Sequence, residues 1–255
     1  MRSTLVDDGL THDAFLGGRV HLWQPRDGYR AGVDPVLLAA SVPAVSGQSV
    51  LELGCGGGVA MACLNTRVAG LSLTGVEVQS AYAALAERNV PEARIVCADL
   101  REMPGDLRQQ SFDHVIANPP FFPRASHTAA RDAGRNAGRM ELDSTISDWI
   151  DVMARRLRPR GFAHIIQRIE RLPELVTACD ARLGSLEVLP IAGRIGRAAH
   201  LVIVRARKGG RAGFRLLPPL ILHEGAHHVG DRDSYAPEIS AVLRDGAPLD
   251  WAGAS

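Results

Sequence analysis

The residues best suited to chemistry are the six at positions 117–122, Ala-Asn-Pro-Pro-Phe-Phe, which follow an apolar run at 112–116. The run predicts a buried strand, and two successive prolines end it because they fix two φ angles and remove two backbone donors. In the resulting corner, the amide oxygen of Asn118 and the carbonyl of Pro119 can accept the two N–H bonds of a flat amine. Phe121 can stack on the ring that carries this amine. A plain strand-to-loop turn is the alternative, since Asn-Pro is a common turn signal.

A glycine-rich turn, Gly-Cys-Gly-Gly-Gly at 54–58, lies upstream of this corner. It joins a segment at 49–53, which predicts a strand, to a segment at 59–68, which predicts a helix. Glycines let the backbone approach a ligand, and a helix N-terminus offers free N–H groups, as in the nucleotide-binding turns of doubly wound sheets. The turn lacks Gly-Lys-Ser/Thr, so a nucleoside bound there need not carry phosphates. Glycine turns also occur where the backbone merely passes close to a neighbouring helix.

Two carboxylates follow at the ends of the next predicted strands. The segment at 73–77 ends in Glu77, 23 residues after Gly54, and the segment at 94–98 is followed by Asp99. An acid about 20 residues beyond the glycine turn is where a ribose diol is bound in such sheets, and Asp99 can accept from an adenine amino group. Four successive strand ends therefore carry polar or glycine signals, at the edge where open α/β sheets bind ligands.

Together these motifs resemble those of the class I S-adenosylmethionine-dependent methyltransferases. The stretch at 52–58 resembles their first motif, Glu77 their ribose acid and Asp99 their adenine contact. The resemblance implies S-adenosyl-L-methionine as cofactor, and Asp34, which can also be a helix cap, falls in a segment expected near its methionine end. The cofactor contacts implied in this way are Asp34, Glu52, Gly54, Cys55, Gly56, Gly58, Glu77, Val78, Asp99, Leu100 and Asn118.

The Asn-Pro-Pro-Phe corner resembles the motif of methyltransferases that act on amino groups of adenine, guanine or glutamine. The segments at 15–19, 24–30 and 32–40 are similar to the N-terminal block of the bacterial valine-tRNA adenosine-37 N6-methyltransferases. The stretch at 218–223, Tyr235 and the stretch at 242–244 are also similar to members of that broad family. That resemblance implies methylation of the exocyclic N6 amine of an adenosine in tRNA. Many relatives carry Tyr where this chain has Phe121, which keeps the stacking face and loses the hydroxyl. The catalytic residues implied are Asn118, Pro119, Pro120 and Phe121.

Other functions stay open at this stage. The same corner would accept a protein glutamine for N5-methylation, or another nucleic-acid amine in rRNA or DNA. A nicotinamide oxidoreductase can use a glycine turn, but it has no role for Asn-Pro-Pro. A non-catalytic RNA- or cofactor-binding module of the same fold is a further alternative, against which the intact Gly54, Glu77, Asp99 and Asn118 argue.

The order of predicted elements indicates an α/β fold with a doubly wound, seven-stranded, mostly parallel Rossmann-like sheet. After the corner we expect a helix at 146–158, a strand at 162–167 and a helix at 170–183. Strands at 186–191 and 200–207 would close the sheet as a terminal antiparallel hairpin. We expect one domain over residues 1–255, with an N-terminal cap (about 1–45), a catalytic core (about 46–215) and a C-terminal extension (about 216–255).

The charge pattern gives a weaker indication of the substrate. The formal net charge is +1, so there is no overall nucleic-acid signature, but residues 194–215 carry seven basic residues and no acid. A solvated hairpin explains this run as well as a phosphate-binding surface does. The loop at 123–140, with four arginines against one acid, follows the corner where a substrate must approach. The predicted substrate contacts are Phe122, Arg124, Arg131, Arg135, Arg194 and Arg197.

Composition bounds the remaining possibilities. The chain is 46% hydrophobic, has no apolar run of the roughly 18 residues that a membrane span needs, and begins without a secretory-type apolar segment. Its four cysteines show no Cys-x-x-Cys pairing, so we expect free thiols in a cytoplasmic protein, with a monomer slightly favoured. The letters His-Glu-Gly-Ala-His at 223–227 match a zinc-protease pattern, but Gly225 opposes the required helix, and we expect no metal site.

Overall fold

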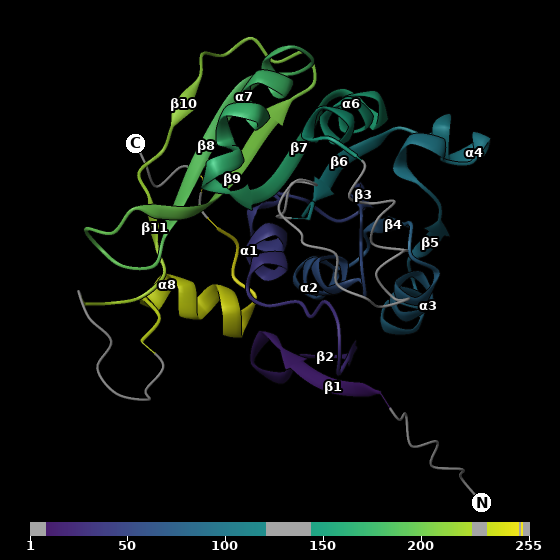
Figure 1. The fold of residues 1–255 in the computed structure, drawn as a ribbon, viewed down its shortest axis with the longest axis horizontal. Coiled ribbons are helices and arrows are strands. Elements are labelled where there is room, and N and C mark those ends of the chain that lie inside the picture. Colours follow the sequence, from purple (N-terminus) through teal and green to yellow (C-terminus); the bar gives the residue numbers. More distant parts are fainter. Residues whose placement is uncertain (1–8, 121–143, 226–233, 250, 252–255) are drawn as a thin grey trace, which may run out of the picture.

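The computed structural model describes residues 9–120, 144–225, 234–249 and 251. Within these residues, nine strands form one sheet in the order β10-β8-β9-β7-β6-β3-β4-β5, with β11 also paired to β8 (Figure 1). The strands are β3 (Ser49–Leu53), β4 (Ser72–Glu77), β5 (Arg94–Cys97), β6 (Phe112–Ala117), β7 (Leu157–Arg168), β8 (Gly184–Ala192), β9 (Ala199–Arg207), β10 (Arg215–Leu216) and β11 (Leu220–Ile221).

Strand directions confirm the predicted doubly wound sheet. Strands β3 to β7 are parallel to one another, whereas β9 runs antiparallel to both β7 and β8. The two-residue strands β10 and β11 extend the sheet beyond the seven strands predicted. Because β3, β4, β5 and β6 are parallel, their carboxyl ends lie at one edge of the sheet, which we call the catalytic edge.

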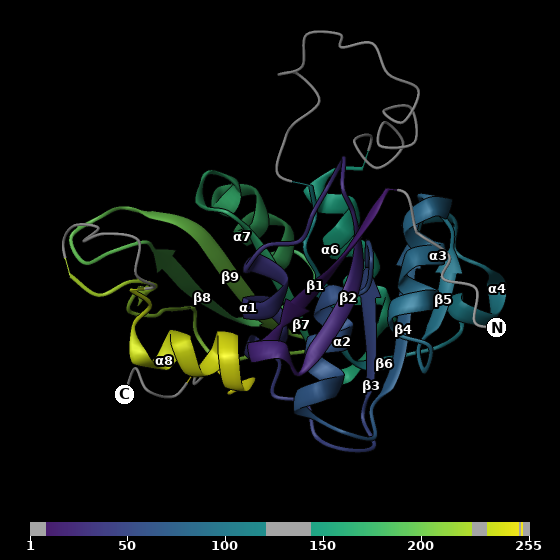
Figure 2. The same cartoon turned by 90° about the horizontal axis from the view of Figure 1, so that it is seen from below.

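Helices cover both faces of the sheet and enclose two buried apolar clusters. One cluster joins α1 (Asp34–Ser41), α2 (Val59–Arg67) and α3 (Ser80–Asn89) to the N- and C-terminal segments. The other joins α4 (Gly105–Arg108), α6 (Ile146–Arg156) and α7 (Leu172–Asp180). Figures 1 and 2 show α6 and α7 on the side of the sheet opposite the N-terminal hairpin. The C-terminal segment adds α8 (Pro237–Ser240) and a π-helix (Ala241–Asp245).

Helix α6 illustrates how the sequence sets an element. Its capping box pairs the Thr145 hydroxyl with the Asp148 N–H and the Asp148 carboxylate with the Thr145 N–H. Arg155 and Arg156 occupy the last turn, where positive charge complements the helix dipole. The spacing of its buried residues, which include Trp149, places them on one face against the sheet.

The N-terminal segment forms a hairpin that the sequence analysis did not predict. Strands β1 (Leu10–Phe15) and β2 (Val20–Pro25) pair antiparallel and separately from the main sheet. The side chain of Asn89 fastens this hairpin to α3, since it pairs with both the N–H (2.8 Å) and the carbonyl (2.9 Å) of Trp23. Its amide also donates to the carbonyl of Gly57 at 2.8 Å, which links the hairpin to the glycine turn. The role of this segment as a cap over the cofactor stays a prediction.

Two predicted boundaries were wrong. Helix α6 ends at Arg156, and residues 159–161, expected to separate helix from strand, lie within β7 as an irregular part of its pairing with β6. Helix α7 ends at Asp180, and Gly184, expected to stop it, begins β8. A Cβ on Gly184 would lie 2.2 Å from the carbonyl oxygen of Gly210, so close backbone approach explains this glycine.

Candidate active site

The glycine turn connects β3 to α2 at the catalytic edge. Gly54, Gly56 and Gly58 have φ angles of 61°, 52° and 81°, in the left-handed region that favours glycine. Gly58 is also the N-cap of α2, and a Cβ there would lie 2.9 Å from a methyl carbon of Val90. The turn therefore needs glycine for its own conformation, in addition to any need for close approach by a ligand.

Glu77, at the end of β4, organises this turn. Its side chain is only 2% exposed, and its two carboxylate oxygens accept from the N–H of Gly56 (2.8 Å) and of Gln79 (2.9 Å). Burial raises the pKa of Glu77, and these backbone donors oppose that rise. An ionised carboxylate has about four acceptor positions, so Glu77 keeps acceptor capacity for a hydroxyl group such as one of a ribose.

Glu52 has a more internal position than its neighbours in the motif. It is 3% exposed and accepts from the N–H of Met61 at 3.1 Å, which ties β3 to α2. Burial raises the pKa of Glu52 to about 8. Cys55, in the turn, is buried as well. The cofactor contacts of these two residues stay predictions.

A pocket opens beside the turn, between the ends of β4 and β5 and the start of α6. Its lining consists of Gly54, Val76, Val78, Ala98, Asp99, Leu100, Ser144 and Trp149. Asp99 accepts from the backbone N–H of Arg101 and forms an ion pair with its guanidinium at 2.6 Å, which lowers the pKa of Asp99. The pocket therefore joins mostly apolar walls to a carboxylate whose two oxygens both accept from the Arg101 guanidinium, so a base with an amino group would share these acceptors with Arg101.

This pocket brings together predicted residues and others that sequence reasoning missed. Gly54, Val78, Asp99 and Leu100 were expected, whereas Val76, Ala98, Ser144 and Trp149 were not. Trp149 is a core residue, only 1% exposed, yet it also lines the pocket. Its indole N–H donates to the Ser144 hydroxyl at 2.9 Å, which fixes the orientation of its ring.

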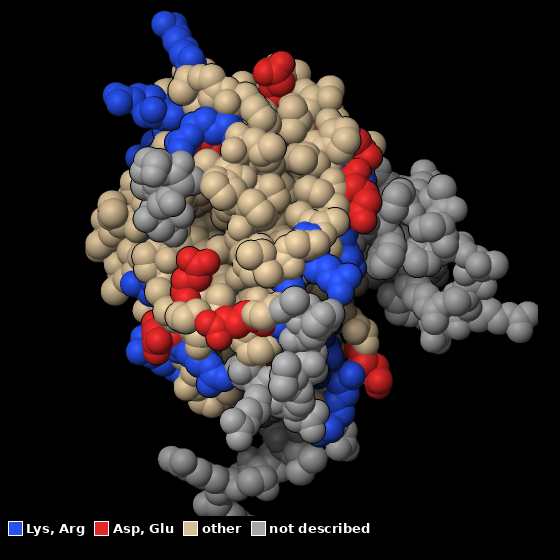
Figure 3. Space-filling view, turned by 90° about the vertical axis from the view of Figure 1, so that its left-hand side faces the viewer, with Lys and Arg blue, Asp and Glu red and all other residues tan. Residues whose placement is uncertain are grey.

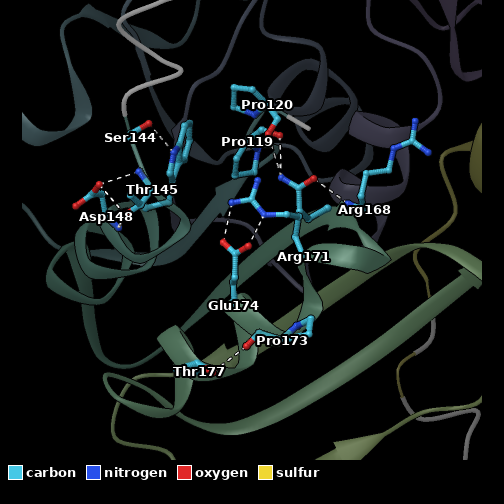
Figure 4. Close-up of polar contacts among 12 residues, drawn as sticks. Pro119, Pro120, Ser144, Thr145, Asp148, Arg168, Arg171, Pro173, Glu174 and Thr177 are labelled. Carbon is cyan, nitrogen blue, oxygen red and sulfur yellow. Dashed lines mark hydrogen bonds and ion pairs between the residues drawn. The ribbon is translucent and has the colours of Figure 1, made fainter. Parts of the chain in front are cut away.

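The Asn-Pro-Pro corner follows β6 at the same edge. The amide oxygen of Asn118 is buried, and no donor in the described part of the chain reaches it. The carbonyls of Pro119 and Pro120 accept from the side-chain amide of Gln167, at 3.2 and 3.3 Å (Figure 4). A carbonyl has two lone pairs, so Pro119 retains capacity for a second donor. Gln167 was not identified from the sequence, because its role depends on the register between β6 and β7.

Asp34 begins α1 and is partly buried. Burial raises its pKa, and the nearby positive charges of Arg168 and His200 oppose that effect. Arg168 ends β7 and His200 lies in β9. Its predicted contact with the cofactor stays a prediction.

The predicted substrate residues divide into two groups. Four of them lie outside the described residues, as does the predicted catalytic residue Phe121; the four are Phe122, Arg124, Arg131 and Arg135. Arg194 and Arg197 lie in the turn between β8 and β9, which extends beyond the catalytic edge because β9 runs antiparallel to β7. The guanidinium of Arg194 donates to the carbonyls of Glu224 and Gly225 and to the Ser234 hydroxyl, so it anchors the C-terminal segment. Arg197 is exposed.

The acid-free run at 194–215 does not form one basic surface. Strand β9 separates Arg197 from Arg207, which pairs with Phe162 near the opposite edge of the sheet. Arg205 and Arg215 both form ion pairs with Glu187. Figure 3 shows basic side chains in separate groups around a broad area without charged side chains. The turn at the catalytic edge is therefore the part of this run nearest to the corner.

The described part of the histidine-rich segment, residues 223–225, is not part of a helix. His223 stacks on Tyr235 at 4.6 Å and lies 3.3 Å from the Ser234 hydroxyl. His227 and His228 lie outside the described residues. Within the described ranges, no group of three or more His, Cys, Asp or Glu residues is placed to hold a metal. The helices of these ranges are also too short or too polar to cross a membrane.

Comparisons with known proteins agree with this geometry. A family model described as "Methyltransferase domain" matches residues 50–140. The tRNA1(Val) (adenine(37)-N6)-methyltransferase of Actinobacillus succinogenes is 27% identical over 203 residues, covering 77% of this chain and 84% of that protein. The protein of the same name from Shewanella baltica is 24% identical over 200 residues, covering 74% and 82%.

Solved structures show the same fold. A predicted O-methyltransferase, Atu636 from Agrobacterium tumefaciens, is similar with a TM-score of 0.68 and 26% identity, over 85% of this chain and 98% of that one. The 16S rRNA N2 G1207 methyltransferase of T. thermophilus shares the fold with a TM-score of 0.53 and 20% identity, over 78% and 50%.

These findings define the class of the protein: the chain carries a class I S-adenosylmethionine-dependent methyltransferase domain. It is a methyltransferase, and S-adenosylmethionine is its cofactor. The pocket beside the glycine turn, and the buried amide oxygen of Asn118 that no donor among the described residues reaches, both fit this cofactor chemistry.

Proposed function

We propose that this enzyme methylates the exocyclic N6 amine of an adenosine in tRNA. The observation that carries the proposal is the buried amide oxygen of Asn118, which has no donor among the described residues and lies beside the carbonyl of Pro119. A buried acceptor without a partner is costly, so such an atom at a strand end indicates a ligand donor. The relatives named as tRNA adenine-37 methyltransferases support the choice of adenosine and of tRNA.

We infer that the cofactor is held along the catalytic edge. The glycine turn at 54–58 would approach the cofactor with its backbone, Glu77 would accept from the ribose hydroxyls, and Asp99 from the adenine amino group. When bound, S-adenosylmethionine supplies an electrophilic methyl carbon. The cofactor and the target amine would then be held by neighbouring strand ends, so the protein contributes proximity and orientation.

The corner itself would activate the amine. The lone pair of an exocyclic adenine nitrogen is delocalised into the ring, which makes it a poor nucleophile. Accepting both of its N–H bonds, at Asn118 Oδ1 and the Pro119 carbonyl, favours a pyramidal nitrogen whose lone pair is free to react. This interaction is stronger in the transition state than in the ground state, as catalysis requires. No strong base is needed, because the extra proton of the methylated amine is acidic. A base stacked within its RNA must first swing out to reach the corner.

A protein glutamine is the second candidate, since its side-chain amide also offers two N–H bonds to the same pair of acceptors. The deciding experiment supplies methyl-labelled S-adenosylmethionine together with total tRNA, rRNA, DNA or protein. Label in tRNA that digests to N6-methyladenosine supports the proposal. Label confined to protein would replace it with glutamine methylation, and label confined to rRNA or DNA would move the substrate to that nucleic acid.

A further inference from the structure

We propose that Gln167 is a positioning residue that holds the Asn118–Pro119–Pro120 corner in place for methyl transfer. Gln167 lies near the end of β7, the strand next to β6, and its side chain is 0% exposed. It touches no reacting atom in this arrangement. It acts through the two proline carbonyls that it binds.

The hydrogen bonds of Gln167 fix the direction of its amide. Its Oε1 accepts from the backbone N–H of Arg168 at 2.8 Å, and an N–H group can only pair with the oxygen end of the amide. The NH2 end must therefore face the corner, where Nε2 lies 3.2 Å from the Pro119 carbonyl oxygen and 3.3 Å from that of Pro120. The assignment of oxygen and nitrogen in this side chain thus follows from its partners.

The strand register explains why a side chain is needed here. The parallel ladder between β6 and β7 pairs Ala117 with Ile165, and Gln167 and Pro119 are each two residues further along. A proline has no N–H, so Pro119 and Pro120 cannot donate to β7, and the backbone ladder must stop. The Gln167 amide supplies the bonds that reconnect the corner to the sheet at this point.

This attachment bears on catalysis because the Pro119 carbonyl is one of two proposed acceptors for the target amine. One lone pair of that oxygen is bound by Gln167, which leaves the other for a second donor. A displacement of about 1 Å between reacting groups can lower a rate by about 10²-fold. The corner must therefore be fixed before substrate arrives, and the buried amide of Gln167 is suited to fix it.

The test compares two substitutions with a matched control. Gln167→Glu keeps an oxygen for the Arg168 N–H but removes both amide donors, and Gln167→Met removes donors and acceptor at similar size. The control is Gln48→Met at the opposite edge of the sheet, where Gln48 Oε1 accepts from the Val45 N–H at 2.9 Å and lies 3.0 Å from His114 Nε2. The control also removes a glutamine side chain that hydrogen-bonds to the backbone. It therefore shows what a general loss of stability does to the rate.

Two measurements separate positioning from structure. The first measurement records the carbonyl resonances of Pro119 and Pro120 by NMR, in protein that carries carbon-13-labelled proline and no substrate. These resonances should shift in both Gln167 variants and stay unchanged in the control. The second is the single-turnover methylation rate at saturating cofactor and substrate, which should fall by about tenfold to about 10²-fold in both Gln167 variants. Cofactor affinity by calorimetry should be unchanged, and Gln48→Met should lower thermal stability while keeping the rate.

The inference rests on the proposed function for the identity of the amine. A failure of the inference can be distinguished from a failure of the proposed function. If the wild-type enzyme labels only protein, the tRNA proposal fails, and the same rate comparison is made on the protein substrate. If the wild type labels nothing, the proline resonances alone decide. Unchanged resonances in both variants would overturn the positioning role, as would shifted resonances with an unchanged rate.

Discussion

Replacing Asn118 by alanine should separate activity from stability. The substitution removes the acceptor proposed for one N–H bond of the target amine. Loss of one such transition-state interaction costs about 10²–10³ in turnover, which corresponds to about 2.7–4 kcal/mol. Cofactor affinity should change little, because the Asn118 amide oxygen is proposed to act on the substrate.

The same substitution should leave the stability of the folded protein nearly unchanged or raise it. In the described part of the chain the Asn118 oxygen is buried without a donor, and such a group costs about 1–3 kcal/mol of folding free energy. Removing it offsets the loss of packing by the side chain. We therefore expect the free energy of unfolding to stay within about 1 kcal/mol of the wild-type value or to rise.

The assay pairs single-turnover methylation with urea unfolding and cofactor calorimetry. Asn118→Asp is the matched variant, because it keeps an oxygen acceptor of nearly the same shape and should recover part of the lost rate. A rate for Asn118→Ala within tenfold of wild type would refute the catalytic role. A large loss of stability would refute the view that the oxygen is an unpaired acceptor in the free enzyme.

Three further predictions concern other parts of the site. Glu77→Ala should weaken S-adenosylmethionine binding by about 1.5–3 kcal/mol in calorimetry, because charge-assisted bonds to the ribose are removed; unchanged affinity would exclude the ribose contact. Arg197→Glu should weaken tRNA binding and reduce the dependence of log affinity on log salt concentration by slightly under one unit for each phosphate that is no longer neutralised. The control Arg211→Glu, near the opposite edge of the sheet, should change neither quantity. Equal effects of the two substitutions would exclude the turn from the RNA interface. Glu52 has a pKa of about 8 when folded, against an ordinary 4.5, so the folded protein keeps a proton that the unfolded chain loses and stability falls as pH rises through this range. Burial lowers the pKa of His114 to about 4 from 6.5, so His114 makes stability rise with pH, but only below pH 6.5. Between pH 6.5 and 8, the free energy of unfolding measured with urea should therefore decline in the wild type and stay constant in Glu52→Gln. The same decline in both proteins would assign it to another group.

The sheet and its catalytic edge could be predicted because each strand there is a short apolar run that ends in a residue of distinct chemistry. Gly54, Glu77, Asp99 and Asn118 mark their own positions in this way. Parallel strands then bring the four ends together without further information. The seven strands expected from these runs are all present, with boundaries shifted by a few residues.

Residues that support the site from other elements could not be found by local patterns. Trp149 follows the helical spacing of a core residue, and nothing in its own segment indicates a pocket wall. Gln167 is 49 residues beyond Asn118, and its role depends on the register between β6 and β7. The acid-free run at 194–215 does not form one basic surface for a related reason. Strand β9 has nine residues, and at about 3.4 Å per residue it separates the two ends of the run by about 30 Å.

The Asn-Pro-Pro corner and the surfaces around the catalytic edge contribute differently to the choice of substrate. The corner offers two acceptors to an NH2 group, and an adenine amine and a glutamine amide satisfy them equally well. Its geometry is set by the Gln167 amide within the protein, so the corner does not need a particular substrate to assemble it. Discrimination between nucleic acid and protein must therefore come from surfaces around the catalytic edge. The exposed Arg197 in the turn between β8 and β9 lies on such a surface, and its contribution should appear in substrate binding and salt dependence, with the rate of the bound complex unchanged.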